Sequence, residues 1–552
     1  MMKRTLIVFL LAPFIISRAQ NLDSLFNEYV KIRGLSVPGY PRVTVSGKPV
    51  KCAFDVVAEV KLNYDRFNIK QKAVIAGTLD RPAADTSFVS PSGKFRIHYY
   101  KSGNNAPKYD LNEFAKAADS SYNYEVNILG YPAPPSDNGA GGDNLYDIYI
   151  KNEGGGEYGG TTPEQMITDS TWTSFMDLDN DFGSEYYTHG IDAARVTVAH
   201  EFHHAIQIGN YIYRPTDKFY HELTSTSMEE FVFNSVNDYY NYLGEYFNNP
   251  VNSFPSHTGY DLAIWNFFLV SRFDSTSVPE NVRGKNIIRR TWQLMPKERA
   301  LQAIADAIQE AGSNFRSEFS TFALWTYFTN YRAVAGKYFK EAANYPLLTP
   351  LMRLSFTKPT TTLNISSEAV SNIFLFFGDN KSNPADTLVS IISNSDIAGA
   401  LSTIPRETSF TYNLSTQAFN GSRQITDGYY SQIQSANDYL FSESNIYNGI
   451  PINGISMVDI GYAFPQPFSY SRNRMLNFPA LSTGSGYGEI YIYNINMELV
   501  YSSQSRIIAT DKIVMQWNGI DSKGKKLGTG VYIYITKCGD NIKKGKFVIY
   551  ND

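Results

Sequence analysis

The segment at residues 195–211, RVTVAHEFHHAIQIGNY, constrains the chain most, because it places three of the seven histidines within five positions. On an α-helix, residues four positions apart lie one above the other on the same face. His200 and His204 would then converge on one point, while Glu201 projects about 100° around the helix. Two imidazoles at this spacing can hold a divalent ion, and the adjacent carboxylate can reach a water bound to it. The segment therefore predicts a metal-binding helix, with a chance occurrence on a surface helix as the alternative.

The residues around the motif favour a buried helix over positions 193–209. Apolar residues precede and follow the histidines, and Gly209 and Asn210 form a helix stop. Imidazoles buried in such a helix would be costly unless a partner compensated them. His203 faces away from the point at which His200 and His204 meet, so we expect it to be packed or to support the site indirectly.

A candidate third ligand, Glu222, follows in KFYHELTSTSMEEFVFNS, 18 residues after His204. This spacing leaves room for a turn and a return helix, which the periodicity predicts over 223–243. Three protein ligands and a water make a catalytic rather than a closed structural zinc site. Glu229 lies two turns further on the same face and could orient a zinc-bound histidine, or else be an exposed helix carboxylate. His221 adjoins Glu222 and is a competing ligand candidate.

The HExxH motif followed by two glutamates seven positions apart resembles the gluzincin metallopeptidases, especially their aminopeptidase and leukotriene-hydrolase branch. In that branch the second part reads EGxAxxxE. Here Glu222 and Glu229 match, but Leu223 and Ser225 replace the glycine and the alanine. The resemblance implies Zn²⁺ as the cofactor and Glu201 as the general base.

The same branch has a tyrosine that hydrogen-bonds the developing oxyanion. Tyr260 occupies a comparable place at the start of the next predicted helix. It is therefore the candidate oxyanion donor, and an ordinary tyrosine, one of 40 in the chain, is the alternative.

A longer resemblance covers residues 88–275. SPSGKFRIHYY, NILGYPAPPSDNGAGGDNLYDIYI, GGTTPEQ, FMDLDNDFG and ARVTVAHEFHHAIQ resemble a family of secreted bacterial metalloproteases with a gluzincin-like domain. The exopeptidase motif GxMEN, which anchors the free amine of a substrate, is absent from the sequence. The resemblance thus implies a zinc endopeptidase acting on protein or peptide substrates.

The chain divides into five predicted segments. Residues 1–20 have the charged start, short apolar core and small polar exit of a secretory signal peptide. Residues 21–90 are mostly helical and end in a Pro/Ala/Ser-rich linker, as in a propeptide, with a permanent N-terminal subdomain as the alternative. Residues 91–345 form an α+β, gluzincin-like metallopeptidase domain, in which strand-like runs precede helical periodicity. Residues 346–460 and 461–552 have the short alternating runs of two all-β, immunoglobulin-like sandwich domains.

The last of these segments contains the pattern WNGxDxxGKxLxxGVYxY, which resembles the C-terminal sorting domains of type IX secretion cargo. Trp517 would anchor its sandwich core. The resemblance implies the type IX secretion machinery as a partner and a location that is secreted or attached to the outer-membrane surface. A plain immunoglobulin-like binding domain is the alternative.

Charge and hydropathy exclude other classes of partner. A formal net charge of -4 argues against nucleic acid, and no run after the signal peptide reaches the roughly 18 apolar residues of a transmembrane helix. The only two cysteines, Cys52 and Cys538, lie near opposite ends of the sequence. We expect them to be half-buried packing residues rather than a disulfide or a metal knuckle.

Two further questions stay open in the sequence. Asp177, Asp179 and Asp181 alternate in MDLDNDFG but lack the twelve-residue EF-hand pattern, so we expect an acidic turn exposed to solvent, with Ca²⁺ as a second candidate cofactor in the alternative interpretation. A surface adhesin, or a glycan- or protein-binding protein with an inactive peptidase-like domain, is the alternative to the zinc endopeptidase. A zinc hydrolase with another substrate is a third candidate.

Overall fold

The computed structural model of the chain describes residues 12–37, 49–154, 156–355, 360–378, 388–415, 430–434, 437–446, 462–471, 473, 475–480, 487–509 and 513–550. They form two compact units, which are Met1–Tyr239 with Trp292–Lys297, and Tyr240–Thr291 with Glu298–Asp552. Residues 1–11 of the predicted signal peptide lie outside the described residues. Among the helices that are described, none combines the length and apolar character that crossing a membrane requires.

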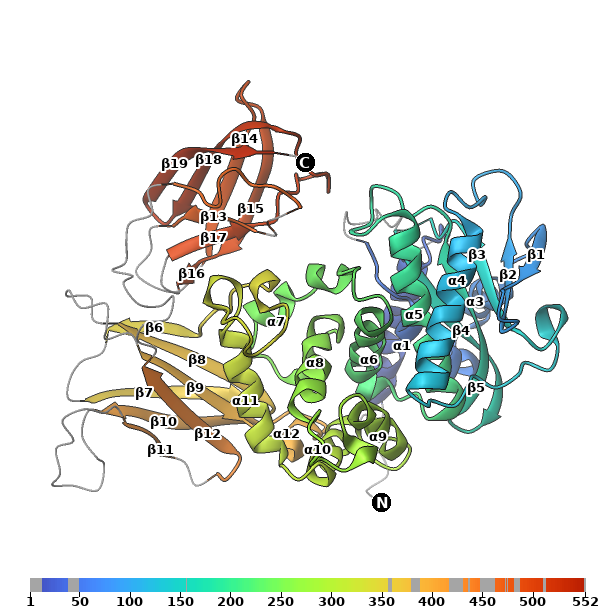
Figure 1. Cartoon of the computed structure of the whole chain (residues 1–552), viewed down its shortest axis with the longest axis horizontal. Helices are drawn as coiled ribbons and strands as arrows, with labels where there is room; N and C mark the ends of the chain where they lie inside the picture. Colours follow the sequence, from blue (N-terminus) through green and yellow to red (C-terminus); the bar gives the residue numbers. More distant parts are fainter. Residues whose placement is uncertain are drawn as a thin grey trace, which may run out of the picture. The chain divides into compact units, whose positions relative to one another are not determined.

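The first unit contains helices and one mixed sheet (Figure 1). Its helices are α1 Ala12–Ile32, α2 Phe54–Leu62, α3 Ile69–Leu79, α4 Leu111–Tyr122, α5 Gly190–Asn210 and α6 Lys218–Val232. Its strands are β1 Thr86–Val89, β2 Phe95–Tyr99, β3 Tyr146–Lys151, β4 Gly159–Thr168 and β5 Thr171–Asp179. The expected helical character of the segment before residue 90 is confirmed for the described residues, and α1 continues across the predicted boundary at residue 20.

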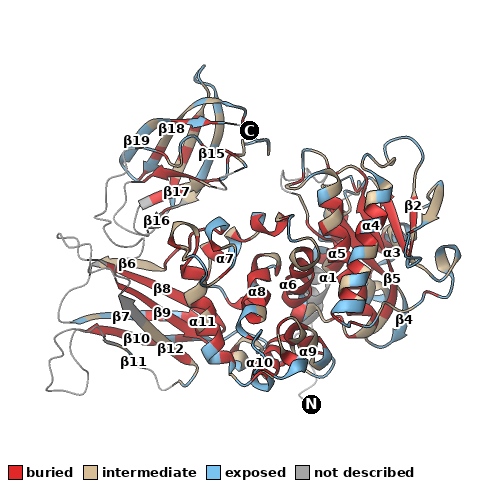
Figure 2. Ribbon diagram, viewed as in Figure 1, coloured by how far each residue is buried: buried red, intermediate tan, exposed pale blue. Residues whose placement is uncertain are grey.

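The sheet has the order β1-β2-β3-β5-β4. Strands β2, β3 and β5 run parallel, whereas the edge strands β1 and β4 pair antiparallel with their neighbours. The central strands are almost wholly buried, as expected for strands covered on both faces (Figure 2). Helix α5 packs against β5 and β4, and α4 packs against α5. The predicted strands FRIHYY, LYDIYI and TSFMDL are therefore confirmed as β2, β3 and β5.

Helix α5 contains its predicted range, 193–209, and begins three residues earlier and ends one residue later, whereas α6 differs more. The helix predicted over 223–243 begins five residues earlier and ends at Val232. Its end is set by tertiary contacts of Asp238, whose carboxylate accepts hydrogen bonds from Tyr158 Oη at 3.1 Å and Thr188 Oγ1 at 2.6 Å. These bonds hold the following residues in a 3₁₀ turn, Asp238–Asn241, in place of a continued helix.

The second unit begins with helices and ends with strands. Its helices are α7 Gly244–Asn248, α8 Ala263–Arg272, α10 Ala300–Glu310, α11 Phe315–Tyr327 and α12 Ile397–Ala400, and α9 Asn286–Leu294 has residues in both units. Its strands are β6 Met352–Ser355, β7 Thr360–Glu368, β8 Ser371–Gly378, β9 Leu388–Asn394, β10 Glu407–Ser415, β11 Tyr430–Gln434, β12 Leu440–Ile446, β13 Leu476–Pro479, β14 Tyr487–Tyr493, β15 Leu499–Arg506, β16 Ile508–Ala509, β17 Ile513–Trp517, β18 Gly530–Cys538 and β19 Asn541–Ile549. The predicted change from helices to strands near residue 350 is confirmed.

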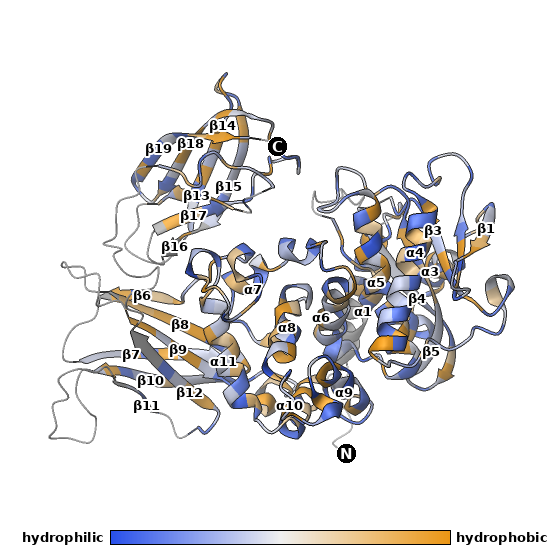
Figure 3. Cartoon of the chain, viewed as in Figure 1, coloured by the Kyte–Doolittle hydropathy of each residue, from blue (hydrophilic) through white to orange (hydrophobic). Residues whose placement is uncertain are grey.

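These strands form two sandwiches. In the first, sheets β11-β10-β7 and β12-β9-β8-β6 share one apolar core, to which the hydrophobic strands β8 and β9 contribute heavily (Figure 3). In the second, sheets β13-β17-β16 and β15-β14-β18-β19 enclose a core that contains Trp517 and Tyr534. Trp517 is buried, and its Nε1 donates to the Ile520 carbonyl at 2.8 Å, so its predicted role as a core anchor is confirmed. The chain is thus a mixed α/β protein with β-sandwich regions, and the predicted domain 91–345 spans parts of both compact units.

Candidate metal centre

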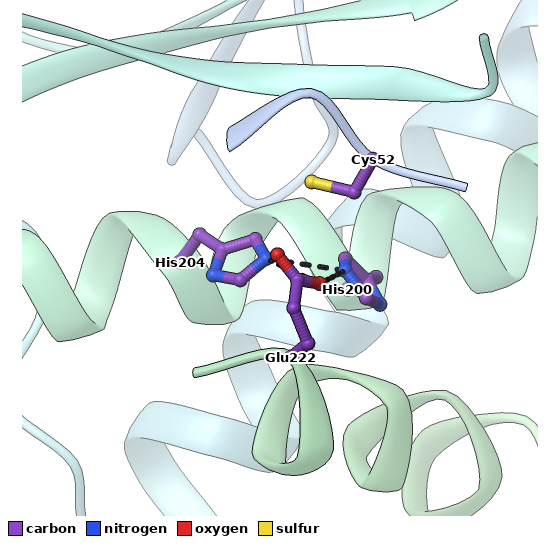
Figure 4. Close-up of side chains that lie close together, drawn as sticks. All are labelled: Cys52, His200, His204 and Glu222. Atoms are coloured by element: carbon purple, nitrogen blue, oxygen red, sulfur yellow. Dashed lines mark hydrogen bonds and ion pairs between the residues drawn. The ribbon is translucent and has the colours of Figure 1, made fainter. Parts of the chain in front are cut away.

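The helix pair α5 and α6 brings the predicted ligands together. His200 Nε2 and His204 Nε2 lie 3.1 Å apart. Glu222 Oε2 lies 3.1 Å from the first and 3.4 Å from the second. Figure 4 shows Glu222 reaching the two rings from α6. Because ligands bound at about 2.0–2.1 Å to a tetrahedral ion lie about 3.3 Å from one another, this triangle has the size of a zinc site.

The other ring nitrogens are also held by partners. His200 Nδ1 lies 2.8 Å from Glu229 Oε1, which is the contact predicted for Glu229. His204 Nδ1 lies 2.8 Å from Gln207 Oε1. A neutral imidazole carries one N–H, so donation from each Nδ1 leaves each Nε2 as an acceptor. Such outer partners fix the ring orientation of metal-binding histidines.

This donor set fits a divalent cation. Two nitrogen lone pairs and a carboxylate oxygen face one another in a buried space, and Glu222 Oε1 is buried without a hydrogen-bond partner among the described residues. Without a cation the group must share a proton instead. Although burial opposes it, hydrogen bonds that the His200 ring donates to the Glu222 and Glu229 carboxylates raise the pKa of His200 to about 10. Against the effect of burial, the facing imidazoles of His204 and His200 lower the pKa of Glu222 to about 2.

Glu201, the predicted base, is fully buried beside this group. Its Oε2 accepts a hydrogen bond from Thr161 Oγ1, on the edge strand β4, at 2.8 Å. Burial raises the pKa of the Glu201 carboxyl, and the imidazoles of His204 and His200 partly offset that effect. A carboxylate with a raised pKa is a better proton acceptor near neutral pH, as a general base requires.

Cys52 joins the same group, which the sequence analysis did not anticipate. One ligand atom from each of Cys52, His200, His204 and Glu222 lies within 4.8 Å of the others. Both cysteines are buried rather than half-buried. The expected packing role is confirmed for Cys538, which lies in the core of the second sandwich, and is wrong for Cys52, which reaches the predicted metal ligands. Burial, and then the charges of Glu201 and Glu222, raise the pKa of the Cys52 thiol. A cation in the site would reverse this effect by favouring the thiolate.

The two remaining histidines of this region point elsewhere. His203 Nδ1 lies 2.7 Å from Glu125 Oε2 in the core, so its predicted packing role is confirmed. His221 Nδ1 lies 3.0 Å from Gln207 Oε1. Its ring packs edge-on against Trp292, and it is not among the converging ligands. The buried His221 is therefore a supporting residue rather than a competing ligand.

Gln207 and Lys51 are functional candidates that sequence reasoning missed. Gln207 lies three residues after His204 on α5 and accepts from its ring, so helical spacing alone could have identified it. Lys51 is buried and pairs with Glu229 at 2.9 Å and with Asp238. No local pattern links Lys51 to a carboxylate 178 residues away.

Tyr260 lies in the second compact unit, at the start of the 3₁₀ turn Tyr260–Leu262. It is half-buried, and its ring centroid lies 5.5 Å from that of Tyr242 in the same unit. Its role as an oxyanion donor stays a prediction.

The acidic run before α5 is engaged by protein donors. Asp177 is buried and pairs with Arg33 at 3.1 Å and Lys151 at 2.8 Å. Asp179 is also buried, and its carboxylate accepts the backbone N–H groups of Asp181, Phe182 and Glu153. The expected turn with solvent-exposed acids is thus wrong for these two aspartates. Asp177 Oδ2 and both oxygens of Asp179 are engaged by protein donors, so these contacts do not favour Ca²⁺, whose binding here stays a prediction.

Comparisons with known proteins leave the family open. Neither a protein-family model nor a curated protein matches the chain. Among solved structures, the chain is similar to PorZ, an essential bacterial surface component of the type IX secretion system of Porphyromonas gingivalis, at 15% sequence identity. The likeness covers 33% of this chain and 30% of that chain, with a TM-score of 0.15, and carries no argument about fold or function.

Proposed function

We propose that the protein is a zinc-dependent endopeptidase of the gluzincin type. The observation that carries this proposal is the convergence of His200 Nε2, His204 Nε2 and Glu222 Oε2 within 3.1–3.4 Å beside the buried Glu201. A structural zinc needs no proton acceptor next to its ligands, whereas metal-assisted hydrolysis does. The intact set of ligands and base also favours an active enzyme over an adhesin with a dead peptidase-like domain.

The mechanism assigns one task to each residue. His200, His204 and Glu222 would hold Zn²⁺, with Glu229 and Gln207 orienting the two rings. When bound, zinc polarises the scissile carbonyl and lowers the pKa of the attacking water toward about 7.

Glu201 then accepts the proton of that water and passes it to the leaving amine. Thr161 holds the Glu201 carboxylate through its Oε2. Tyr260 is our candidate for stabilising the oxyanion of the tetrahedral intermediate.

The location and partners are part of the same proposal and rest on the sequence. The signal-peptide pattern of residues 1–20 supports export, and the likeness of residues 461–552 to sorting domains supports passage through the type IX machinery. We accordingly place the protein outside the cell or on the outer-membrane surface, with proteins or peptides as substrates.

Metal analysis and casein hydrolysis test the proposal. Both are measured on the full chain and on the chain after limited proteolysis in the linker between α3 and β1. We expect about one zinc per chain. The variant Glu201→Gln should keep the metal but lose about 10²–10⁴-fold in hydrolysis, because it removes the proton acceptor and no ligand.

The matched control is Glu113→Gln, which changes a partly exposed glutamate of α4 that pairs with Lys116 and Arg195 and contacts no metal ligand, and it should alter neither quantity. Absence of bound zinc, or hydrolysis by Glu201→Gln at the wild-type rate, would refute the proposed peptidase.

A further inference from the structure

Resting on the zinc site just proposed, we infer that Cys52 is the fourth ligand of the metal and that residues 50–54 hold the peptidase site closed. Three protein ligands leave one position of a tetrahedral zinc open for water, and a fourth protein ligand fills it. The Cys52 sulfur lies in the same group as His200, His204 and Glu222, all four of them buried. Figure 4 shows Cys52 entering the group from a chain segment separate from α5 and α6.

The sulfur is directed into the site by local structure. Cys52 lies two residues before the first residue of α2, and the backbone N–H of Phe54 lies 3.2 Å from its Sγ. This contact fixes the direction of the sulfur, which points into the group formed by His200, His204 and Glu222.

The segment around Cys52 is paired by its backbone with the chain that leads into β4. Val50 donates to the Gly156 carbonyl at 2.9 Å and accepts from the Tyr158 N–H at 3.0 Å. Ala53 donates to the Gly159 carbonyl at 3.3 Å. Because β4 is the edge of the sheet, an extended peptide could pair with it by adding a strand, which is a common mode of peptide recognition. Residues 50–53 pair with the residues that lead into β4 and with Gly159, its first residue, so we infer that they take the place of a substrate strand at the start of this edge.

The side chains on either side of Cys52 contact the groups that hold the two histidines. Lys51 Nζ lies 2.9 Å from Glu229 Oε2, whose other oxygen faces His200. The Phe54 ring stacks on the His204 ring, with centroids 4.1 Å apart and an angle of 18° between the planes. The segment thus touches both zinc-binding rings or their partners, so its removal would change the surroundings of the metal as well as its fourth ligand.

The region before residue 90 is fastened to the rest of the first unit by buried cations. Arg33 pairs with Asp177 at 3.1 Å and also with Glu153 and Glu157. Arg81 pairs with a second carboxylate cluster, made up of Asp137, Asp147 and Glu164. Lys51 occupies a third, between Glu229 and Asp238.

Complementary charge at three places explains how this region keeps Cys52 in position. These pairs also mean that residues 50–54 are firmly attached to the rest of the first unit. Displacement therefore requires cleavage of the chain or loss of these pairs.

Opening the site is a ligand exchange without oxidation or reduction. The bond between sulfur and metal breaks, the thiolate takes up a proton from solvent, and a water oxygen takes the vacated position. Glu201 then lies beside that water, as the proposed hydrolysis requires.

Cobalt substitution of the full chain tests the ligand directly. With Cys52 bound, the cobalt protein shows the near-ultraviolet charge-transfer absorption of a thiolate ligand. Cys52→Ser should lose this band while still binding cobalt. Cys538→Ser, the matched control, removes the other buried cysteine of the chain. It should retain the charge-transfer band. X-ray absorption of the zinc-loaded wild type needs no variant and should show one sulfur at about 2.3 Å.

Casein hydrolysis by the same proteins tests the closing role. We expect limited proteolysis in the linker between α3 and β1 to make the wild type at least about tenfold faster, because cleavage releases residues 50–54 and the rate follows the fraction of molecules whose fourth position is open. Cys538→Ser should match the wild type.

A zinc-loaded wild type with no sulfur ligand would overturn the inference. So would a wild type that hydrolyses casein before proteolysis as fast as after it, because residues 50–54 would then not close the site. Sulfur ligation without hydrolysis in any form, proteolysed or not, would instead refute the peptidase and the closing role while leaving Cys52 as a ligand.

Discussion

The two sides of the candidate metal centre differ in how far apart their residues lie in the sequence. One side is the helix pair α5 and α6, which supplies His200, His204, Glu222 and Glu229 within 30 residues. The other is the segment at residues 50–54, which supplies Cys52 from 148 positions before His200. The periodicity of the α-helix positions the residues of the helical side. Strand pairing and buried ion pairs position those of the N-terminal side.

This difference separates the residues that form the metal site from the residues that control access to it. The helical residues are enough to hold a metal and supply a base. The N-terminal residues add a fourth donor and a cation, neither of which hydrolysis requires. If that division is correct, changes on the helical side should abolish metal binding, and changes on the N-terminal side should alter stability or access.

The largest effect is expected from Glu222→Ala. It removes the single carboxylate among the three helical donors, so zinc affinity should fall by more than the roughly 100-fold seen when an outer hydrogen-bond partner is lost. Casein hydrolysis should drop to background. Zinc titration against a chelating dye measures the affinity, and Glu113→Ala on α4 is the control. Wild-type affinity in Glu222→Ala would mean that the helical side does not hold the metal.

The next effect is expected from Lys51→Met. Lys51 is 3% exposed and lies between Glu229 and Asp238, so its loss leaves two buried carboxylates without their cation. Breaking a buried pair in this way costs about 3–5 kcal/mol of unfolding free energy. Urea denaturation of the metal-free protein measures it.

The control for Lys51 is Lys116→Ala, which breaks an exposed pair with Glu113 on α4 and should leave the urea midpoint unchanged. A midpoint for Lys51→Met that equals the wild type would show that the N-terminal segment is not anchored through this cation.

The smallest effect is expected from Glu229→Gln. Glu229 is the residue that contacts both the helical side and the N-terminal side of the site. Glu229 faces His200 Nδ1 through one oxygen and Lys51 through the other. Glutamine can still accept from the ring but lacks the charge, so zinc affinity should fall about 10–100-fold, or about 1.4–2.7 kcal/mol. Gln207→Ala, which removes the partner of His204, should fall in the same range. An unchanged affinity in both variants would show that the outer partners do not orient the rings.

Much of the candidate site could be predicted from the sequence, because it depends on helical periodicity. His200 and His204 are one turn apart and Glu222 and Glu229 two turns apart, so each pair shares a face wherever the helices are packed. Gln207 follows the same rule and could have been found. The end of α6 could not, since the contacts of Asp238 with Tyr158 and Thr188 override local helix propensity there.

The fold shows the same limit. Short apolar runs predicted β2, β3 and β5, of which β3 and β5 are buried on both faces, and the change to short alternating runs predicted the sandwiches. The order β1-β2-β3-β5-β4, which makes β4 an edge, depends on pairing between distant segments. The solvent exposure expected for the aspartates before α5 was wrong because Arg33, far away in sequence, pairs with Asp177.

By itself the sequence determined which helix carries the histidines, which carboxylates face them, and which regions form strands, since these follow from repeats of two and 3.6 residues along one chain. Only the tertiary structure decided that Cys52 reaches the metal ligands, that Lys51 compensates Glu229, and that residues 50–53 pair along the sheet edge. The physical reason is that contacts across more than a hundred residues are selected by the packing, charge pairing and hydrogen bonding of the whole unit, and no local repeat encodes them.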